Sequence, residues 1–208
     1  NLLYCKLSSL QLDDTSAQDV KAYLNRGMIF NQIGLDGCAA SDFSQVIKIN
    51  PKSAEAYVKR GSTYGSSFNE AISDYNIAIK INPKYAQAYI GRAMTYIMLN
   101  KYAQAIADFD QAIKINPNDF ETYKSRAFTY SNYLKQYEKA LADLNQSIKI
   151  KSKIDSSDYE LRAEIYGELK QYDKSIADYT QYIKMNSHAS YIVYTYLRRA
   201  TIYVESRQ

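Results

Sequence analysis

The feature that most constrains this chain is a short phrase that recurs at nearly constant spacing. An apolar–basic–apolar triplet precedes Asn-Pro three times, at Asn50-Pro51, Asn82-Pro83 and Asn116-Pro117. The triplet returns without proline at Ile148-Lys149-Ile150 and Ile183-Lys184-Met185. Alignment on these marks divides the chain into five units, 20–53, 54–85, 86–119, 120–154 and 155–189, with half units at 1–19 and 190–208. A period of this size predicts a solenoid of stacked supersecondary units.

Each unit has the pattern of two amphipathic α-helices. The first helix of the unit 86–119 carries one stripe at helical spacing, formed by Tyr89, Arg92, Ala93 and Tyr96. A second helix with its own apolar stripe is expected up to Ile115. Asn116 suits a left-handed C-cap, and Pro117 cannot continue the helix. Neither helix can bury its stripe alone, so neighbouring helices must stack on both.

This pattern resembles the tetratricopeptide repeat (TPR) family over nearly the whole chain. The family's small and aromatic positions are matched in the third unit by Tyr89, Ala93, Tyr96, Tyr102, Ala105, Phe109, Ala112 and Pro117. In the second unit they are Tyr57, Gly61, Tyr64, Phe68, Ala71, Tyr75, Ala78 and Pro83. The resemblance implies an all-α, right-handed superhelical solenoid of antiparallel helix pairs, forming a single domain over 1–208. Ser152 and Ser187 replace the expected proline, and we expect a looser joint at 152–157.

Every first helix carries an arginine where the family more often has a large apolar residue. The set is Arg26, Arg60, Arg92, Arg126, Arg162 and Arg199. Each second helix has an aspartate at a fixed place: Asp42, Asp74, Asp108, Asp143 and Asp178. Because an unpaired buried arginine would cost several kcal/mol, we expect a structural ladder of ion pairs. Pairing within each unit leaves Arg199 over, and pairing with the preceding unit leaves Arg26 over. A row of anion-binding arginines is the alternative, but it would need differences among the units that this set lacks.

The resemblance also implies a ligand site, because the first helices of TPR proteins line a concave groove that binds peptides. The solvent-facing positions expected to line it are Leu24, Met28, Val58, Ile90, Met94, Met98, Lys124, Phe128, Glu160, Glu164 and Glu168. The apolar positions suit an apolar or amphipathic segment, and the glutamates favour basic residues on it. In the alternative interpretation, Ile90 and Met98 pack against the next helix and the glutamates form a solvated face.

Two other binding functions are disfavoured. Chaperone-binding TPR proteins hold a terminal carboxylate with Lys and Asn, but Leu24 and Met28 stand at those places and Lys59 stands where a further Asn is expected. The triplet lysines lie near the ends of second helices, where a cation favours the helix dipole. Because arginine and aromatic interleaving is absent from that row, no nucleic-acid partner is expected.

The chain is not predicted to be an enzyme. Glu160, Glu164 and Glu168 lack a second, differently tuned group nearby in the sequence, and no GxGxxG, GxxxxGK[ST] or HExxH motif occurs. Two cysteines and one histidine are too few for a Cys/His zinc site, and no cofactor is implied. No apolar run approaches the ~20 residues that span a bilayer, so membrane insertion is not expected. The sequence specifies no compartment, although the cytoplasm is favoured.

The sequence therefore predicts a scaffold or adaptor that binds a peptide or amphipathic helix of another protein. One alternative is a regulatory or targeting module cut from a larger protein or enzyme. Another is head-to-tail self-association, in which the terminal helix of 190–208 completes the half repeat 1–19 of a second molecule.

Overall fold

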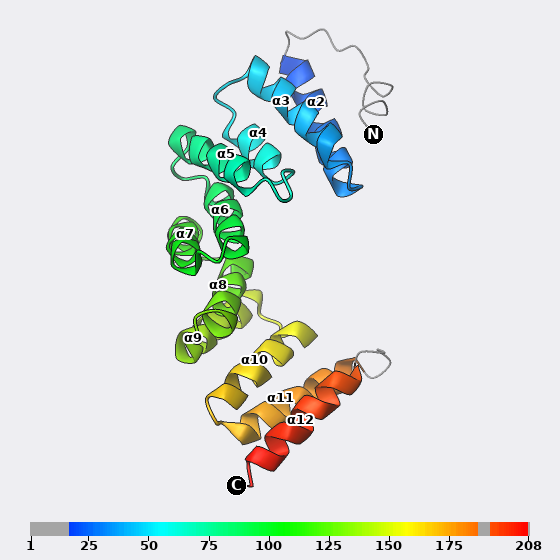
Figure 1. Ribbon diagram of the computed structural model, residues 1–208, viewed down its shortest axis with the longest axis vertical. Helices are drawn as coiled ribbons and strands as arrows, with labels where there is room; N and C mark the ends of the chain where they lie inside the picture. The colour runs from blue at the N-terminus through cyan, green and yellow to red at the C-terminus, as the bar shows by residue number, and fades with distance from the viewer. Residues whose placement is uncertain (1–16, 187–191, 208) are drawn as a thin grey trace. The chain divides into compact units, whose positions relative to one another are not determined.

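The computed structural model describes residues 17–186 and 192–207, and all regular secondary structure in these ranges is α-helical. The half repeat expected at 1–19 therefore lies almost wholly outside the described residues. The chain divides into two compact units, residues 1–116 and 117–208, which are described separately. The described helices occur in antiparallel pairs, as expected for a helical TPR solenoid (Figure 1).

Unit 1 contains three helix pairs. Its helices are α2 (Ala17–Gln32), α3 (Asp36–Ile49), α4 (Ala54–Gly61), α5 (Phe68–Ile81), α6 (Ala86–Met98) and α7 (Tyr102–Ile115). Each even-numbered helix packs on the helix that follows it, and neighbouring pairs meet through α3 with α4 and through α5 with α6 (Figure 1). Every helix except the terminal α2 and α7 is thus covered by neighbours from two pairs within this unit.

Unit 2 contains two helix pairs and one further helix. These are α8 (Phe120–Asn132), α9 (Tyr137–Lys151), α10 (Ser156–Glu168), α11 (Tyr172–Met185) and α12 (Ile192–Glu205). Helix α9 contacts α10, and α11 lies between α10 and α12 (Figure 1). The order within the unit places α8, α10 and α12 as first helices of successive repeats.

The cores of the repeats pair a small residue on the first helix with a large one on the second. Ala93 of α6 and Phe109 of α7 are both fully buried in one cluster. At the equivalent place in α4, a Cβ built on Gly61 would lie 3.0 Å from the Tyr75 ring. The small side chain therefore sets how closely the two helices approach, which is why this position repeats in the sequence.

The Asn-Pro pairs end their helices differently from the prediction. Asn116 has a φ of −128°, so the left-handed C-cap expected there is wrong. Asn50 and Asn82 have similar φ values of −128° and −134°. Each side-chain oxygen instead accepts from a backbone N–H two residues on, at Lys52 and Lys84. The following proline explains this, because it clashes with the preceding residue outside the extended region.

The joint at 152–157, where a looser connection is predicted, contains a helix cap and several ion pairs. Ser152 has φ of 57° and ends α9 in the left-handed conformation that the Asn-Pro marks do not use. Asp155 then caps α10: its carboxylate accepts from the Asp158 N–H, and the Asp158 carboxylate accepts from the Asp155 N–H, both over 3.0 Å. This reciprocal capping box fixes the start of α10 without a proline.

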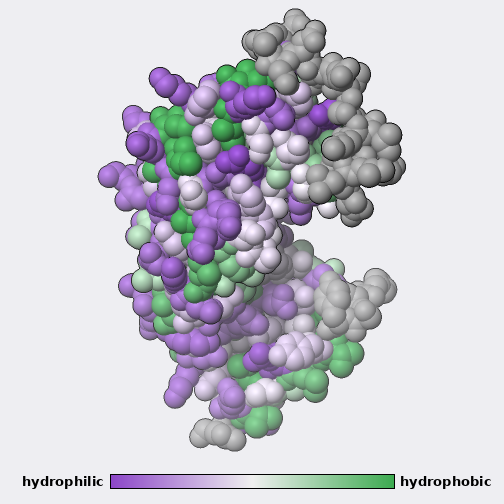
Figure 2. Space-filling model, turned by 45° about the horizontal axis from the view of Figure 1, so that its top comes forward, coloured by the Kyte–Doolittle hydropathy of each residue, from purple (hydrophilic) through white to green (hydrophobic). Residues whose placement is uncertain are grey.

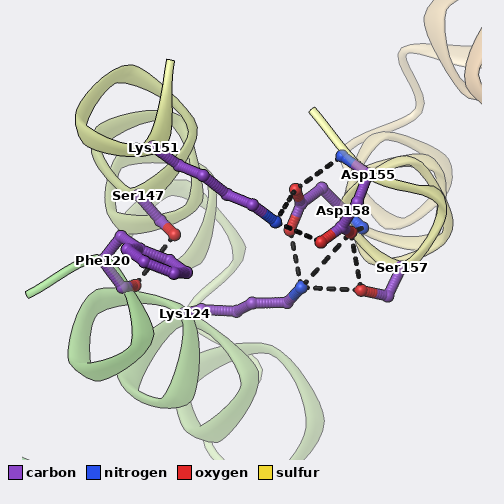
Figure 3. A network of polar contacts seen from close by, with 7 residues as sticks. All are labelled: Phe120, Lys124, Ser147, Lys151, Asp155, Ser157 and Asp158. Carbon is purple, nitrogen blue, oxygen red and sulfur yellow. Dashed lines mark hydrogen bonds and ion pairs between the residues drawn. The ribbon is translucent and has the colours of Figure 1, made fainter. Parts of the chain in front are cut away.

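Two lysines from the preceding repeat close on that capping box (Figure 3). Lys124 Nζ lies 2.6 Å from an Asp158 carboxylate oxygen, and Lys151 Nζ donates to Asp155. Burial raises the pKa of Asp155, but hydrogen bonds from Lys151 and Ser157 outweigh it and hold that pKa well below its usual range. The prediction of a looser joint considered the missing proline and not these charges, which join the two sides of the joint.

Candidate functional site

Each complete helix pair holds one two-pronged ion pair between its helices. Arg92 Nε donates to Asp108 Oδ2 over 2.8 Å, and its Nη2 donates to Oδ1 over 2.7 Å. The same geometry, with separations of 2.6–2.8 Å, joins Arg26 to Asp42, Arg60 to Asp74, Arg126 to Asp143 and Arg162 to Asp178. The aspartates are buried, while the arginines are partly exposed. Pairing therefore occurs within each repeat.

A third guanidinium nitrogen reaches the preceding helix pair. Arg60 Nη1 donates to Ser44 Oγ over 3.1 Å, and Arg92 Nη1 donates to Asn76 Oδ1 over 2.5 Å. The hydrogen bond to Asp108 raises the pKa of Arg92, although burial opposes the rise. Donors engaged in this way hold the scaffold together and have little capacity left for an anionic ligand.

Arg199 on α12 departs from the set. Its Nη1 donates to Thr180 Oγ1 over 3.1 Å, which repeats the bridge to the preceding second helix. In the described ranges no carboxylate forms an ion pair with it. Because each of the other arginines pairs with the aspartate of its own repeat, Arg199 is the arginine that remains without such an aspartate.

The predicted groove positions differ widely in exposure. Those that are clearly exposed are Met94, Met98, Phe128 and Glu168, with Met98 at 65%. Those that are partly exposed are Leu24, Met28, Ile90, Lys124, Glu160 and Glu164. In the space-filling view, hydrophobic side chains reach the surface in separate patches among hydrophilic ones (Figure 2). The exposed positions can contact a ligand directly, whereas the rest are shared with the packing of the helices.

Three of the predicted groove positions make contacts within the fold, and one of them, Val58, is wrong as a solvent-facing position because it is buried. Val58 is only 9% exposed and packs in a core cluster with Ala71 and Ala88. Leu24 packs against the core around Val46, and Lys124 is committed to Asp158. A first helix is flanked by neighbours on two sides, so positions chosen by spacing alone fall partly in the core.

Some exposed apolar residues escaped the sequence analysis. Ile29 and Ile33 on and just after α2 are 56% and 63% exposed. Tyr133 follows α8 and forms an edge-to-face pair with Phe128, with ring centroids 6.0 Å apart. These residues lie outside the helical stripe from which the groove positions were predicted. In the sequence they are recognisable only as single large apolar side chains.

Unit 2 contains a polar hollow with a volume of about 550 Å³. It is bounded by α8, the first residue of α9, α10, α11 and α12, and by the loops after α8 and α10. Its lining residues are Ser131, Asn132, Lys135, Tyr137, Glu164, Gly167, Glu168, Lys170, Tyr172, Tyr179, Arg198, Thr201, Ile202 and Glu205. Of these, only Glu164 and Glu168 were predicted as site residues, because the remainder converge from segments far apart in the sequence.

Gly167 allows α12 to approach α10 at the edge of this hollow. A Cβ built on Gly167 would lie 2.9 Å from Cδ1 of Ile202. Real Cβ atoms essentially never approach so closely. Ile202 therefore lies close to Gly167, and Arg198 and Glu205 of the same helix line the hollow together with Glu164.

Glu164 is held in an unfavourable environment for a carboxylate. Burial raises its pKa, and the charges of Glu160 and Glu168 raise it further. Arg198 and Lys135 oppose the rise without cancelling it. The cations already present in the hollow therefore leave the ionised form of Glu164 incompletely compensated.

Phenolic groups surround the glutamate row on α10. Burial raises the pKa of Glu160, while a hydrogen bond with Tyr182 opposes the rise. Burial raises the pKa of Tyr137, as does its hydrogen bond with Glu168. Burial also raises the pKa of Tyr179, as does the charge of Glu164. The raised pKa values keep Tyr137 and Tyr179 protonated at neutral pH, so these phenols add no negative charge beside the glutamate row.

The described ranges contain neither a metal-binding cluster nor a membrane-spanning helix. No group of three or more His, Cys, Asp or Glu side chains there could hold a metal ion. Among the same residues, no helix combines the length and apolarity that crossing a membrane requires.

The similarity to known proteins follows the repeat pattern. Models of the tetratricopeptide repeat match residues 86–119, 109–142 and 159–188. No curated protein matches the sequence.

Solved structures share the fold at low identity. A protein described under the functional characterization of Pseudomonas aeruginosa pilF is 15% identical, with a TM-score of 0.77 over 91% of this chain and 86% of that one. A thermophilic TPR protein of Thermus thermophilus is 20% identical, with a TM-score of 0.65 over 89% and 99%. YrrB, a TPR protein with an unusual peptide-binding site, is 14% identical, with a TM-score of 0.65 over 83% and 89%.

The family matches cover units in both halves of the chain, and the helix pairs repeat one geometry with one set of small, aromatic and ion-pairing residues. The chain belongs to the tetratricopeptide repeat family.

Proposed function

We propose that the chain is a non-catalytic adaptor that binds a segment of another protein on the face of unit 2 containing the polar hollow. The bound segment places a basic side chain beside Glu164. Family membership supports the general function, since tetratricopeptide repeats are generally protein-interaction scaffolds. The peptide-binding site named for YrrB supports it by analogy of fold.

The single observation that carries the proposal is the hollow of about 550 Å³ in unit 2, which Glu164 and Glu168 line together with Lys135 and Arg198. Burial and the neighbouring Glu160 and Glu168 disfavour the charge of Glu164 more than Arg198 and Lys135 favour it. A further cation from a ligand would relieve this imbalance, so that binding and ionisation of Glu164 reinforce each other. A carboxylate retained at a cost in stability is typical of a binding surface.

The aromatic pair beside the hollow gives the partner an apolar anchor. Phe128 and Tyr133 are 43% and 41% exposed and meet edge to face. Ser131 and Asn132, which line the hollow, lie between them in the sequence. Rigid aromatic side chains next to polar groups are typical of strong contact positions in protein interfaces.

Unit 1 offers a second contact surface on its own first helices. Met94 and Met98 are exposed one turn apart on α6, and Ile90 is partly exposed one turn before them. Methionine adapts its shape to a ligand, so this stripe suits an apolar or amphipathic segment. We include it in the proposal as a separate surface.

A positional peptide library tests the unit 2 assignment. Immobilised nonapeptides that carry Lys or Arg at one fixed position are compared with peptides that carry Glu or Leu there. The full chain is expected to prefer the basic peptides, and Glu164→Gln with Glu168→Gln is expected to abolish that preference. Glu138→Gln on the exposed side of α9 removes the same charge as a control. An unchanged basic preference in the double variant would show that the hollow is not the site.

A further inference from the structure

The two loops that bound the hollow in unit 2 hold lysines in a backbone conformation that does not suit them. Lys135 follows α8 with a φ of 54°, and Lys170 follows α10 with a φ of 57°. In this left-handed region most residues other than Gly, Asn and Asp are disfavoured. The surrounding fold therefore holds both lysines in place at some cost in stability.

The corresponding loops of unit 1 contain the residues that this conformation favours. These loops also join first helices to second helices, and their left-handed positions are Gly34, Gly65 and Asn100. Unit 2 has lysine instead in two successive repeats, at the same end of α8 and α10. Lysine gives the backbone no conformational advantage there, so any advantage comes from its side chain.

Both lysine side chains are exposed and line the hollow. Within the described residues, neither Lys135 nor Lys170 forms an ion pair or a side-chain hydrogen bond, and Lys135 acts on Glu164 only through its charge. Arg198, a further cation of the lining, instead donates to the Tyr194 hydroxyl over 3.2 Å and lies over the Tyr194 ring. The two lysines are thus the cations of the hollow whose donors are available to a ligand.

The lining combines glutamates on a helix with lysines in the loops. Glu164 and Glu168 lie one turn apart on α10, whereas Lys135 and Lys170 lie in the loops after α8 and α10. A segment with charge of one sign would be attracted by one of these sets and repelled by the other. A segment that carries both signs can satisfy the glutamates and the lysines together.

We propose that the hollow of unit 2 binds a bipolar segment of the partner protein, in which an Asp or Glu side chain accompanies the basic one. The basic side chain lies at Glu164, as the proposed function on which this inference rests assigns it, and the acidic side chain lies at Lys135 and Lys170. Each ammonium group has three donors, so two of them can hold one carboxylate through charge-assisted hydrogen bonds.

A glutamate scan of one host peptide tests this pairing. The host is a nonapeptide of Ser and Ala with a central Lys, a fluorophore at its amino end and an amide at its carboxyl end. Glu or Gln replaces each other position in turn, and anisotropy titration with the full chain measures the affinity. At one or two positions, Glu is expected to bind at least about threefold more tightly than Gln, as two exposed ion pairs would provide. The amidated end ensures that a side chain supplies the carboxylate.

Variants of the lysines separate binding from folding. Lys135→Asn with Lys170→Asn removes both ammonium groups, and asparagine suits the left-handed backbone. This double variant should keep or exceed the parent thermal midpoint and should lose the preference for Glu over Gln. It should still prefer a central Lys over Leu, because Glu164 and Glu168 are unchanged.

A charge reversal and a matched control complete the set. Lys170→Asp also suits the left-handed backbone, and it should favour Lys over Glu at the selected peptide position. Lys149→Gln removes the same charge from an exposed site on α9 outside the lining, and it should keep the preference for Glu.

The outcomes distinguish this inference from the proposed function. A preference for the central Lys, with no position at which Glu tightens binding, would overturn the inference and leave the proposed function in place. Absence of the central-Lys preference would overturn both. A Glu preference that survives in the double variant, or that Lys149→Gln removes equally, would overturn the inference. So would a lowered thermal midpoint of the double variant with unchanged peptide binding, because the lysines would then serve the helix dipoles.

Discussion

Arg92 and Asp108 form a two-pronged ion pair between α6 and α7, with Nε 2.8 Å from Oδ2 and Nη2 2.7 Å from Oδ1. The aspartate is buried, and the arginine side chain keeps 19% of its exposure. The pair recurs in every complete helix pair of the described chain, so its energy bears on the whole solenoid.

We predict that Asp108→Ala destabilises the protein by about 3 kcal/mol, the lower end of the range for orphaning one member of a buried pair. The lower end applies because the Arg92 guanidinium still reaches water and can recover some hydration. Urea denaturation followed by circular dichroism measures the change. Arg199→Ala is the matched control: it removes a cation without a carboxylate partner in the described chain and should cost less than about 1 kcal/mol. If Asp108→Ala and Arg199→Ala destabilise the protein equally, the ion pair does not contribute the stability assigned to it.

Gly91→Ala should destabilise the protein although alanine is the better helix former. A Cβ at Gly91 would lie 2.5 Å from Cε1 of Tyr75, whose buried ring is held on another side by Gly61. Overpacking of this kind costs about 1–3 kcal/mol, which exceeds the gain of about 1 kcal/mol in helix propensity. We expect a net loss of up to about 2 kcal/mol in thermal or urea denaturation.

Gly37→Ala provides the opposite case. Gly37 lies in the first turn of α3, and a Cβ there meets no atom within 4 Å. Its replacement should leave stability unchanged or raise it by up to about 1 kcal/mol. If both glycine variants gain stability, the close approach of α5 and α6 at Gly91 is not a packing constraint.

Glu164→Gln should stabilise the folded protein at neutral pH. The folded-state pKa of Glu164 is raised by burial and by Glu160 and Glu168, so the ionised form is penalised in the folded state. Two like-charge contacts of this spacing cost roughly 0.4–1 kcal/mol in total. The gain should be present above the raised folded pKa and should vanish as pH falls toward about 4, where the unfolded side chain also binds a proton. Stability curves of both proteins between pH 4 and 8 provide the measurement, and a destabilised variant at pH 7 would contradict the assignment.

Asp155→Asn should show the reverse dependence on charge. The folded-state pKa of Asp155 is lowered despite burial, by its bonds with Lys151 and Ser157, so the ionised form stabilises the fold above about pH 4. Asparagine keeps an N-cap acceptor for α10, so the variant isolates the charge. Because the side chain is 38% exposed, the expected loss is limited to about 1 kcal/mol at pH 7. The difference from wild type should shrink as pH falls below about 4 through the folded pKa.

Hydrogen exchange locates that loss. Amides at the start of α10 should exchange faster in Asp155→Asn, while those of α6 in unit 1 should be unchanged. Lys153→Ala, an exposed change in the same joint, is the control and should leave both regions as they are. Faster exchange with Lys153→Ala as well would mean that the joint is sensitive to any substitution.

The helix pairs were predictable because their signals are local and repeated. Spacing along one helix decides which residues share its face, so Tyr89, Arg92, Ala93 and Tyr96 could be grouped without coordinates. The same repetition indicated that the arginines pair with the aspartates, but it left open whether Arg92 pairs with Asp108 of its own unit or with Asp74 of the preceding unit. The C-cap at Asn116 was less predictable, because the proline after it outweighs the preference of asparagine for the left-handed region.

The candidate site was only partly predictable because its lining converges from separate repeats. Spacing alone could not distinguish Val58, which neighbours bury, from Met98, which they leave exposed. It identified Glu164 but not Arg198, which lines the same hollow from a different helix, α12. It also could not show that Lys124 is neutralised by Asp158 across the joint.

The sequence by itself determined the repeat period, the pairing of helices and the identity of the ion-pairing residues, because each depends on residues within about one unit of each other. Tertiary structure decided which first-helix side chains remain accessible, how the charges around Glu164 balance, and that Arg199 alone of its set lacks a carboxylate in the described chain. Those properties depend on how neighbouring repeats stack, and stacking sets burial and electrostatic environment through contacts that no single repeat contains.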